Sequence, residues 1–393
     1  MTTGELPLAG TTVVALEQAV AGPLASRHLA DLGARVIKIE RPGQGDFARD
    51  YDAAVHGLST HFAWLNRGKE SLAIDLKSDG GLRAARELIA RADVFLHNTA
   101  PGALERLGLD GETLRAAHPR LVVVNISGYG TGGPRRDRKA YDMLVQAETG
   151  MVAVTGTPET PSKTGVPNAD IGAGLYAAMS AMSALLRRER TGAGGVVDVS
   201  MFDAAVEWMG HPLYMQLYGG AQIPRMGLSH AAIAPYDAYP TADGQILIGV
   251  QNDRGWRRLV TEVFGAPEHA EDPRFATNVD RVRNRAECDA LVAACTARFA
   301  TAELDERLAA AGIPAAQING TAELAEHPQL AERDRWRTVP TEAGEIRGVL
   351  PPMTFRDAEL PMGRLPALGE HNAAILAELE LDDQPDSGGD VDG

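Results

Sequence analysis

Short apolar runs alternate with amphipathic stretches over the first third of the chain. Thr11–Ala15, Val36–Ile39 and Leu121–Ile126 are almost continuously apolar, which is typical of strands buried on both faces of a parallel sheet. Between the first two runs, Leu24–Leu32 has helical spacing and is followed by Gly33. The pattern therefore predicts a β–α–β unit that begins an open parallel sheet, an α/β fold with helices on both faces.

The same alternation continues to about residue 127, and a different pattern follows it. After Val196–Val199, which predicts one more strand, a helical stretch runs from Met201 to about Leu217. A predicted β-hairpin and several helices then indicate a smaller α+β domain over residues 225–330, and the final part is expected to return to the first domain. The other predicted elements are strands at Leu72–Leu76, Val94–His97, Tyr236–Pro240, Ile246–Val250 and Gly348–Leu350, and helices at Gly80–Ala90, Ala103–Leu107, Trp256–Phe264, Arg281–Phe299, Thr301–Ala311 and after Gly369.

Charge and composition narrow the classes of partner. The formal net charge of −15 disfavours nucleic acid or an anionic membrane surface. Cys288 and Cys295 are too few for a disulfide framework and are not spaced as metal ligands, so we expect no metal and a cytoplasmic location. The first ten residues do not resemble a signal peptide. The longest nearly apolar run, Ala173–Leu186, is too short to span a bilayer, and the acidic tail after Leu381 is expected to be disordered.

The most distinctive stretch is an Ala-, Leu- and Met-rich helix that is predicted to begin at Asp170 and to end before Gly192. A carboxylate at a helix start faces unpaired backbone N–H groups and the positive end of the helix dipole, so we expect Asp170 to be ionised near neutral pH. Gly172 and Gly174 each cost the helix about 1 kcal/mol relative to alanine, but their missing side chains would let a large ligand approach the carboxylate. On this stretch alone, Asp170 is either an N-cap residue or a reactive group.

Glycines and cations in three loops indicate a ligand that carries phosphate. Arg41 and Arg49 follow the second strand, Leu65–Lys69 is a polar turn with two cations, and the glycine-rich loop Ser127–Pro134 precedes four closely spaced cations. The alternative interpretation is that these side chains are simply solvated. The first β–α turn lacks G-x-G-x-x-G, and no Walker, G-x-S-x-G or H-E-x-x-H motif is present, so dinucleotide, P-loop, hydrolase-type serine and metal chemistry lose support.

Seven segments extend these observations over nearly the whole chain. They are AGPLASRHLADLGARVIKIERPGQGD at 21–46, LNRGKESLAIDLKS at 65–78, ADVFLHNTAPGALERLG at 92–108, NISGYGTGGP at 125–134, AYDMLVQAETG at 140–150, Asp170 with its glycines, and HAAIAPYDAYPTADG at 230–244. In content and in order they resemble the class III CoA-transferase family, whose relatives include the 2-methylacyl-CoA racemases.

The resemblance implies a large Rossmann-like domain made of residues 1–215 and 331–393, a small α+β domain at 225–330, and an interlocked homodimer. It also implies an enzyme that moves coenzyme A from an acyl-CoA donor to a carboxylic acid acceptor, with no permanently bound cofactor. Asp170 would be the covalent nucleophile and would carry CoA as an aspartyl thioester. The CoA contacts that the resemblance implies fall on Arg41, Leu65, Asn66, Arg67, Lys69, Asn98, Arg106, Lys139, Ala140 and Tyr141.

One position separates the transferases from the racemase relatives. Racemases carry a histidine before the aspartate in the segment after the glycine loop, whereas here Tyr141 precedes Asp142. Tyrosine, with a pKa near 10, is a poor base at neutral pH, which favours transfer over racemisation. An acyl-CoA racemase and a non-catalytic CoA-binding protein remain the alternatives.

The substrate acids are less clearly indicated. Within the family that the chain resembles, formyl-CoA transferase has a glycine run that closes over oxalate and formate. Residues 215–260 lack such a run, which argues against those substrates. Asp142, Gly172, Arg225 and His230 are expected near the acyl group, and pairing of Arg225 or His230 with a distal carboxylate would suit a C4–C5 dicarboxylate such as succinate, itaconate or mesaconate. The alternative is a surface arginine and a packed histidine.

Overall fold

The apolar runs near the start of the chain form one parallel sheet in the computed structural model, which describes residues 5–381. The tail after Leu381 lies outside the described residues. The strand order is β3-β2-β1-β4-β5-β6, and Val13 pairs with Val36 on one side and with Val94 on the other, so the order reverses at β1. The strands are β1 (Thr12–Leu16), β2 (Arg35–Glu40), β3 (Lys69–Ala73), β4 (Val94–His97), β5 (Val122–Ser127) and β6 (Gly195–Ser200).

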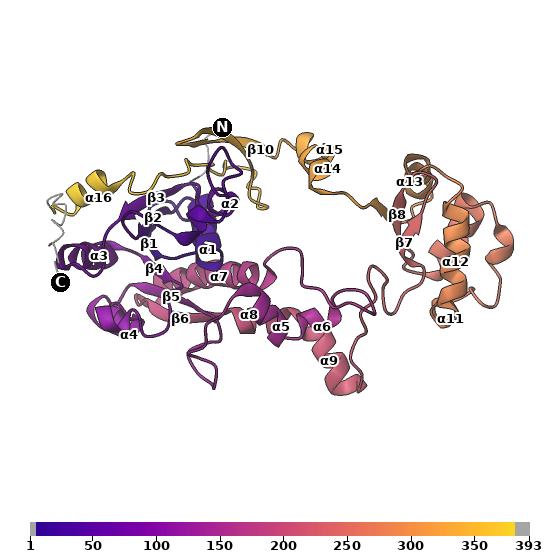
Figure 1. Ribbon diagram of the computed structural model, residues 1–393, viewed down its shortest axis with the longest axis horizontal. Helices are drawn as coiled ribbons and strands as arrows, with labels where there is room; N and C mark the ends of the chain where they lie inside the picture. The colour runs from indigo at the N-terminus through magenta and orange to yellow at the C-terminus, as the bar shows by residue number, and fades with distance from the viewer. Residues whose placement is uncertain (1–4, 382–393) are drawn as a thin grey trace, which may run out of the picture. The chain divides into compact units, whose positions relative to one another are not determined.

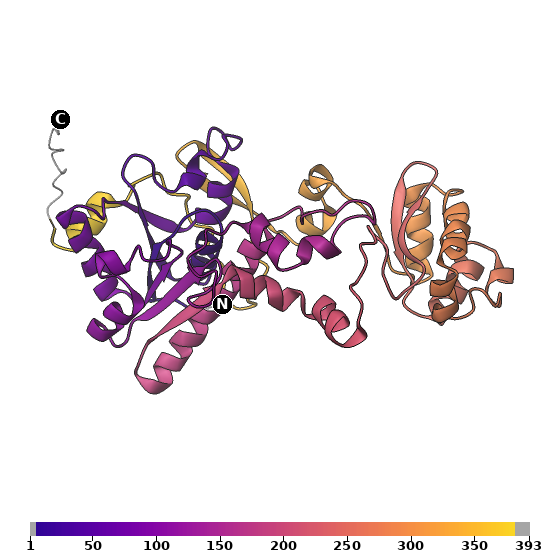
Figure 2. The same ribbon diagram turned by 60° about the horizontal axis from the view of Figure 1, so that its bottom comes forward.

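Helices cover both faces of this sheet (Figures 1 and 2). α1 (Ala21–Asp31), α7 (Asn168–Thr191) and α8 (Met201–Trp208) pack on one face. The opposite face is covered by α3 (Asp79–Arg91), α4 (Gly111–Ala117) and α16 (Asn372–Glu378). Because strand side chains alternate, Val13 contributes to the core beneath α1 and α7, whereas Val14 contributes to the core beneath α3 and α4.

The chain divides into two compact units. Unit 1 comprises the residues up to Met151, Thr164–Gly210 and the residues from Glu332 onward, and unit 2 comprises Val152–Lys163 and His211–Ala331. Further elements are η1 (Phe47–Asp50), α2 (Thr60–Asn66), η2 (Glu105–Leu107), α5 (Asp142–Glu148), α6 (Met151–Val154), α9 (Gly210–Gly219), α14 (Thr321–Ala325), α15 (Pro328–Ala331), β10 (Trp336–Thr341) and β11 (Gly344–Val349).

Unit 2 contains an antiparallel sheet with helices packed on it (Figures 1 and 2). Ile246, Ile248 and Trp256 are completely buried in its core. Its elements are β7 (Tyr236–Pro240), β8 (Gln245–Gly249), α10 (Asp253–Arg258), η3 (Leu259–Val263), η4 (Pro267–His269), α11 (Asn278–Arg283), α12 (Arg285–Thr296), α13 (Thr301–Ala310) and β9 (Ala315–Gln317).

Two predicted helices are interrupted. The helix expected over residues 201–217 divides into α8 and α9 near Met209, because Pro212 has no N–H to donate to the carbonyl four residues earlier. The helix expected at Trp256–Phe264 continues from α10 into a π-helical turn, η3. Local periodicity predicted helix in both places but could not reveal these changes in backbone hydrogen bonding.

α7 is long and apolar enough to cross a membrane when only length and composition are considered. It is longer than the run Ala173–Leu186 because it includes polar residues at both ends. Half of its most apolar window is buried inside the protein. Its alanines, including Ala173, Ala177 and Ala181, pack in the core beside α1, which accounts for its apolar character without a membrane.

Candidate active site

Asp170 lies in the first turn of α7, but it is not the residue that caps the helix. The helix begins at Asn168, the N-cap position is Pro167, and that position makes no side-chain capping bond. The N-cap interpretation of Asp170 is therefore wrong. Its carboxyl group instead lies near the backbone N–H of Ala21, the first residue of α1, and this N–H lowers its pKa.

The start of α7 is capped by a neighbouring helix. Asp142 Oδ1 accepts from the backbone N–H groups of Ala169 at 2.8 Å and Asp170 at 3.4 Å. Its other oxygen accepts from Gln146 Nε2 at 2.7 Å, and Gln146 Oε1 accepts from the Thr164 N–H at 3.1 Å. Asp142 thus satisfies the amide groups that Asp170 was expected to face. Sequence reasoning missed Gln146, which stands four residues after Asp142, a spacing that places both on one side of α5.

The pKa of Asp170 differs from expectation. Burial raises it, the nearby Asp142 carboxylate raises it further, and the Ala21 N–H opposes both, with the result that the pKa is about 7. The expectation of a fully ionised carboxylate at neutral pH is therefore wrong, because it counted the helix dipole and left out burial and a like charge. A carboxyl group with this pKa is partly protonated at neutral pH. Such a carboxylate is more basic than an ordinary aspartate.

The two glycines of α7 serve helix packing. A Cβ at Gly174 would lie 2.8 Å from the Ala21 carbonyl oxygen, so this glycine lets α7 approach the first turn of α1 closely. A Cβ at Gly172 would lie 3.3 Å from the Trp208 ring. The space that the sequence indicated for a ligand is thus occupied by α1 and α8, and close packing brings Asp170 to the start of α1.

A cavity of about 480 Å³ opens at the carboxyl ends of β1, β2 and β4, where the strand order reverses. Ligands of open α/β sheets bind at this position. Three cations line it, Arg41, Lys77 and Arg106, together with the carboxylates of Glu17, Glu40, Asp46 and Asp75. Glu17, Glu40 and Asp46 are each paired with another cation inside the protein. Sequence reasoning missed Lys77, although its place just after a strand of a parallel sheet was a usable signal.

Asn98 connects this cavity with the start of α1. Its side chain accepts from the Gln18 N–H at 2.9 Å and donates to the Gln18 carbonyl at 2.8 Å, and Gln18 itself lines the cavity. A Cβ on Gly22, in the first turn of α1, would lie 3.1 Å from Asn98 Cγ. Cavity, Asn98, α1 and Asp170 are therefore consecutive neighbours within unit 1.

The predicted polar turn at residues 65–69 is instead buried. Leu65, Asn66, Arg67 and Lys69 lie at the end of α2 and the start of β3 and are at most 5% exposed. Arg67 makes a two-pronged ion pair with Asp31. Lys69 Nζ donates to Glu17 Oε1 at 2.7 Å and to Asn66 Oδ1 at 2.9 Å. These charges are neutralised inside the protein.

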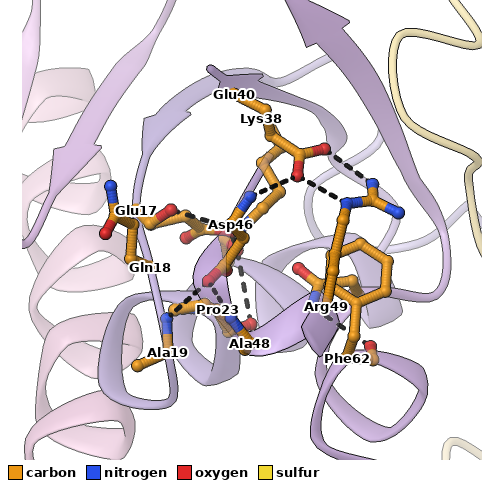
Figure 3. Close-up of polar contacts among 12 residues, drawn as sticks. Glu17, Gln18, Ala19, Pro23, Lys38, Glu40, Asp46, Ala48, Arg49 and Phe62 are labelled. Carbon is orange, nitrogen blue, oxygen red and sulfur yellow. Dashed lines mark hydrogen bonds and ion pairs between the residues drawn. The ribbon is translucent and has the colours of Figure 1, made fainter. Parts of the chain in front are cut away.

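Arg49 also has an internal role. It donates to both Glu40 oxygens, each at 2.8 Å, and its guanidinium lies 3.7 Å from the centre of the Phe62 ring (Figure 3). Of the arginines that follow the second strand, only Arg41 therefore faces the cavity, and it is exposed.

The segment Lys139–Asp142 lies beside Asp170. Tyr141 is 64% exposed and precedes α5, while Lys139 is exposed and Ala140 packs against Gly128. The pKa of the half-exposed Tyr51 is raised by partial burial and by the charges of Asp46, Asp170 and Tyr141. Tyr51 was not predicted. Two cations of the expected phosphate loop, Arg135 and Arg138, are paired with Glu148.

Arg225 and His230 belong to unit 2. Arg225 donates to the carbonyls of Thr157 and Pro158, each at 2.9 Å, and of Ala153 at 3.3 Å, so it holds a loop of that unit. His230 is exposed and stacks on Tyr236. Its Nδ1 accepts from the Ala232 N–H at 3.1 Å, which places the proton of the neutral ring on Nε2.

A larger cavity of about 670 Å³ lies at the carboxyl ends of β4, β5 and β6. Arg136 is the one cation among its lining residues, which include the acidic side chains Asp110, Asp137 and Asp198. It suits phosphate less well than the smaller cavity. Among residues 5–381, no group of three or more His, Cys, Asp or Glu side chains is arranged to hold a metal ion.

A parallel sheet with a cavity where its strand order reverses, beside a buried carboxyl group with a raised pKa, suits an enzyme that binds its ligand there and uses this group in its chemistry. The model of CoA-transferase family III matches residues 8–372, and the chain belongs to this family. It is therefore a CoA-transferase whose substrates are CoA thioesters, as the resemblance implied.

Named relatives agree with this assignment. The chain is 36% identical over 384 residues to the succinate–glutarate CoA-transferase of Agrobacterium fabrum, covering 95% of this chain and 96% of that protein. It is 37% identical over 377 residues to the acetyl-CoA:oxalate CoA-transferase of Acetobacter aceti, with the same coverage. The crystal structure of a CaiB/BaiF family protein from Brucella suis superposes with a TM-score of 0.86 at 38% identity, covering 96% of this chain and all of that one.

Proposed function

We propose that CoA transfer proceeds through an aspartyl-CoA thioester on Asp170. The observation that carries the proposal is the contact of the Asp170 carboxylate, whose pKa is about 7, with the Ala21 N–H at the start of α1. No side-chain capping bond is made at this end of α1, and its Ala21 N–H lies near the carboxylate. A more basic carboxylate is a stronger nucleophile, and a fixed N–H donor stabilises charge that develops on its carbonyl oxygen.

Four displacements complete the reaction without net consumption of protons. An Asp170 oxygen attacks the thioester carbonyl of the donor, the C–S bond breaks, and an acyl–aspartyl anhydride and CoA thiolate form. The thiolate attacks the aspartyl carbonyl, releasing the donor carboxylate and leaving the aspartyl-CoA thioester. The acceptor carboxylate attacks this thioester and expels the thiolate, which then attacks the acceptor's carbonyl in the new anhydride. The products are the new acyl-CoA and the Asp170 carboxylate.

The cavity at the reversal of strand order is proposed to hold the phosphate-bearing part of CoA. Arg41, Lys77 and Arg106 would contact the phosphates, and Asn98 lies between them and Asp170. Leu65, Asn66, Arg67 and Lys69 are buried and would support this site from beneath. Lys139, Ala140 and Tyr141 are proposed to border the thioester end because the next residue, Asp142, accepts from the Asp170 N–H.

Trapping tests the covalent intermediate. The protein is incubated with succinyl-CoA in the absence of an acceptor acid, digested, and analysed by mass spectrometry with and without hydroxylamine. We expect the peptide that contains Asp170 to gain the mass of CoA, and hydroxylamine to convert this adduct into a hydroxamate. Unmodified Asp170 under conditions that support turnover would contradict the proposal.

We propose C4–C5 dicarboxylates as the acids. Relatives are named for succinate, glutarate and mesaconate, whereas another is named for oxalate. His230 is the better candidate for the distal carboxylate because its Nε2 can donate, while Arg225 is engaged with three carbonyls. Competition among succinate, glutarate, itaconate, mesaconate and oxalate for one acyl-CoA donor tests this, and a preference for oxalate would contradict it.

The pH dependence of kcat follows from the pKa of Asp170. The ionised form is the nucleophile, so kcat should fall as the pH drops below about 7. Asp142→Asn removes the like charge that raises this pKa, so the fall should move to lower pH, while the amide oxygen can still accept from the Ala169 N–H. Plots of log kcat against pH measure the shift. An unchanged profile would contradict the assignment.

The quaternary structure is proposed to be an interlocked homodimer in the cytoplasm, without nucleic acid or membrane. Large apolar side chains are exposed on two helices, namely Leu175, Met179 and Leu186 on α7 and Tyr214, Leu217 and Tyr218 on α9. A second subunit would cover such surfaces. Size-exclusion chromatography with light scattering should give twice the chain mass at micromolar concentration, and a monomer would contradict the proposal.

A further inference from the structure

The turn that leads from β1 into α1 is held by side chains from other strands. The Glu17 carbonyl accepts from Lys38 Nζ at 3.2 Å, and Gln18 is bonded through both backbone groups to Asn98. The Ala19 N–H donates to Asp46 Oδ1 at 3.1 Å (Figure 3). Every residue of Glu17–Ala19 thus has a backbone group fixed by a side chain that is distant in sequence.

This turn has an unfavourable backbone conformation. Ala19 has a φ of 63°, in the left-handed region that alanine seldom adopts, and no glycine is present between β1 and Ala21. Such a conformation persists when surrounding contacts impose it. The side-chain contacts therefore stabilise a backbone conformation that a glycine-rich sequence permits in other β–α turns.

Asp46 and Lys38 are the centre of these contacts. Both are buried, and their ion pair measures 2.8 Å. Asp46 Oδ1 accepts from both Ala19 and Ala48, and the Asp46 N–H donates to Glu40 Oε1 at 3.0 Å (Figure 3). A charged pair without water around it holds its partners in one geometry, because any displacement leaves a buried charge unpaired.

This turn leads into Ala21, at the point where the first turn of α1 packs against α7: a Cβ at Gly174 would lie 2.8 Å from the Ala21 carbonyl oxygen. The Ala21 N–H lies near the Asp170 carboxylate and lowers its pKa. We propose that Asp46 and Lys38 are positioning residues for CoA transfer: they fix the Glu17–Val20 turn so that the first N–H of α1 is directed at Asp170. The proposal rests on the proposed role of Asp170 as the nucleophile and adds the residues that set its electrostatic surroundings.

Loosening of this turn should also change the acid limb of the pH profile, which is the range in which kcat falls as the pH is lowered. The Ala21 N–H lowers the pKa of Asp170, while burial and Asp142, from α5, raise it, and Tyr51 and Tyr141 are the other titratable groups nearby. If the turn loosens, the N–H contact weakens and the pKa of Asp170 rises further. The loss of kcat on acidification then begins at a higher pH.

Asp46→Asn and the double variant Lys38→Met/Asp46→Asn test the proposal. The double variant removes both charges together, so no buried charge is left alone and folding is less impaired. We expect kcat to fall by about tenfold to a hundredfold and the acid limb to move to higher pH. The kcat and pH effects should appear in any of these variants that folds.

Asp93→Asn is the matched control. Asp93 also combines an ion pair, with Arg188 at 2.9 Å, and a bond from a backbone N–H, that of Thr12 at 2.9 Å, but it lies at the amino ends of β1 and β4, away from the turn that follows β1. The Asp93→Asn variant should have a lower melting temperature than the wild type and an unchanged acid limb of the pH profile. If the folded double variant keeps the wild-type kcat and pH profile, or if Asp93→Asn shifts the profile equally, the positioning role is overturned. If the trapping experiment on the wild type finds no CoA on Asp170, the proposed role of Asp170 as the nucleophile is overturned instead.

Discussion

Asp170→Asn is expected to lower kcat for CoA transfer by at least about 10³-fold while leaving the fold intact. The amide keeps the size of the side chain and an oxygen that can accept from the Ala21 N–H. It has no ionisable oxygen with which to open a thioester. It also removes a carboxyl group whose pKa is raised by burial, so the variant should be at least as stable as the wild type. Steady-state transfer and thermal unfolding, measured on one preparation, check both parts.

Two accompanying variants make this result specific. Asp170→Ala cannot regain a carboxylate by deamidation, so it should lack even the slow return of activity that an asparagine can show. Asp79→Asn makes the same change in the first turn of α3, on the opposite face of the sheet, and should retain activity. Turnover by Asp170→Ala at a rate near that of the wild type would exclude covalent catalysis at this position.

The parallel sheet could be predicted from the sequence because its strands are short, apolar on both faces and separated by amphipathic helices. Val94–His97 is the same in prediction and structure, and β1 and β5 differ from prediction by a residue at each end. The burial of residues 65–69 could not be predicted in this way. Their sequence suggests an exposed cationic turn, and only the fold shows that Asp31 and Glu17 lie beside them as counter-ions. A charge is buried or exposed according to partners that are distant in sequence.

The candidate nucleophile could be located from the sequence, but its protonation state could not be predicted. Its raised pKa depends on burial and on Asp142, which approaches from α5. The glycines of α7 could likewise be recognised as important without revealing that α1 and Trp208 fill their space. Lys77, Tyr51 and Gln146 reach the site through tertiary packing. Chain periodicity carries no information on such pairings.

Asp31→Asn is expected to destabilise unit 1 by about 3 to 5 kcal/mol, since it breaks a buried ion-pair cluster by removing its one negative partner. Asp31 is 1% exposed and contacts the guanidinium groups of Arg67 and Arg27. Burial already lowers the pKa of Arg27 to about 10, and the Asp31 charge opposes that effect. Without it, two buried cations face each other. Urea denaturation followed by circular dichroism measures the loss.

The same variant separates the two roles considered for Arg67. If Arg67 supports the CoA site only from beneath, stability falls, and the variant that folds keeps a KM for acyl-CoA close to that of the wild type. If its guanidinium binds a CoA phosphate directly, releasing it from Asp31 should change KM as well as stability. Glu303→Gln, which removes a half-exposed pair with Arg307, is the control and should cost less than about 0.5 kcal/mol. Equal losses from the two variants would contradict the buried role of Arg67.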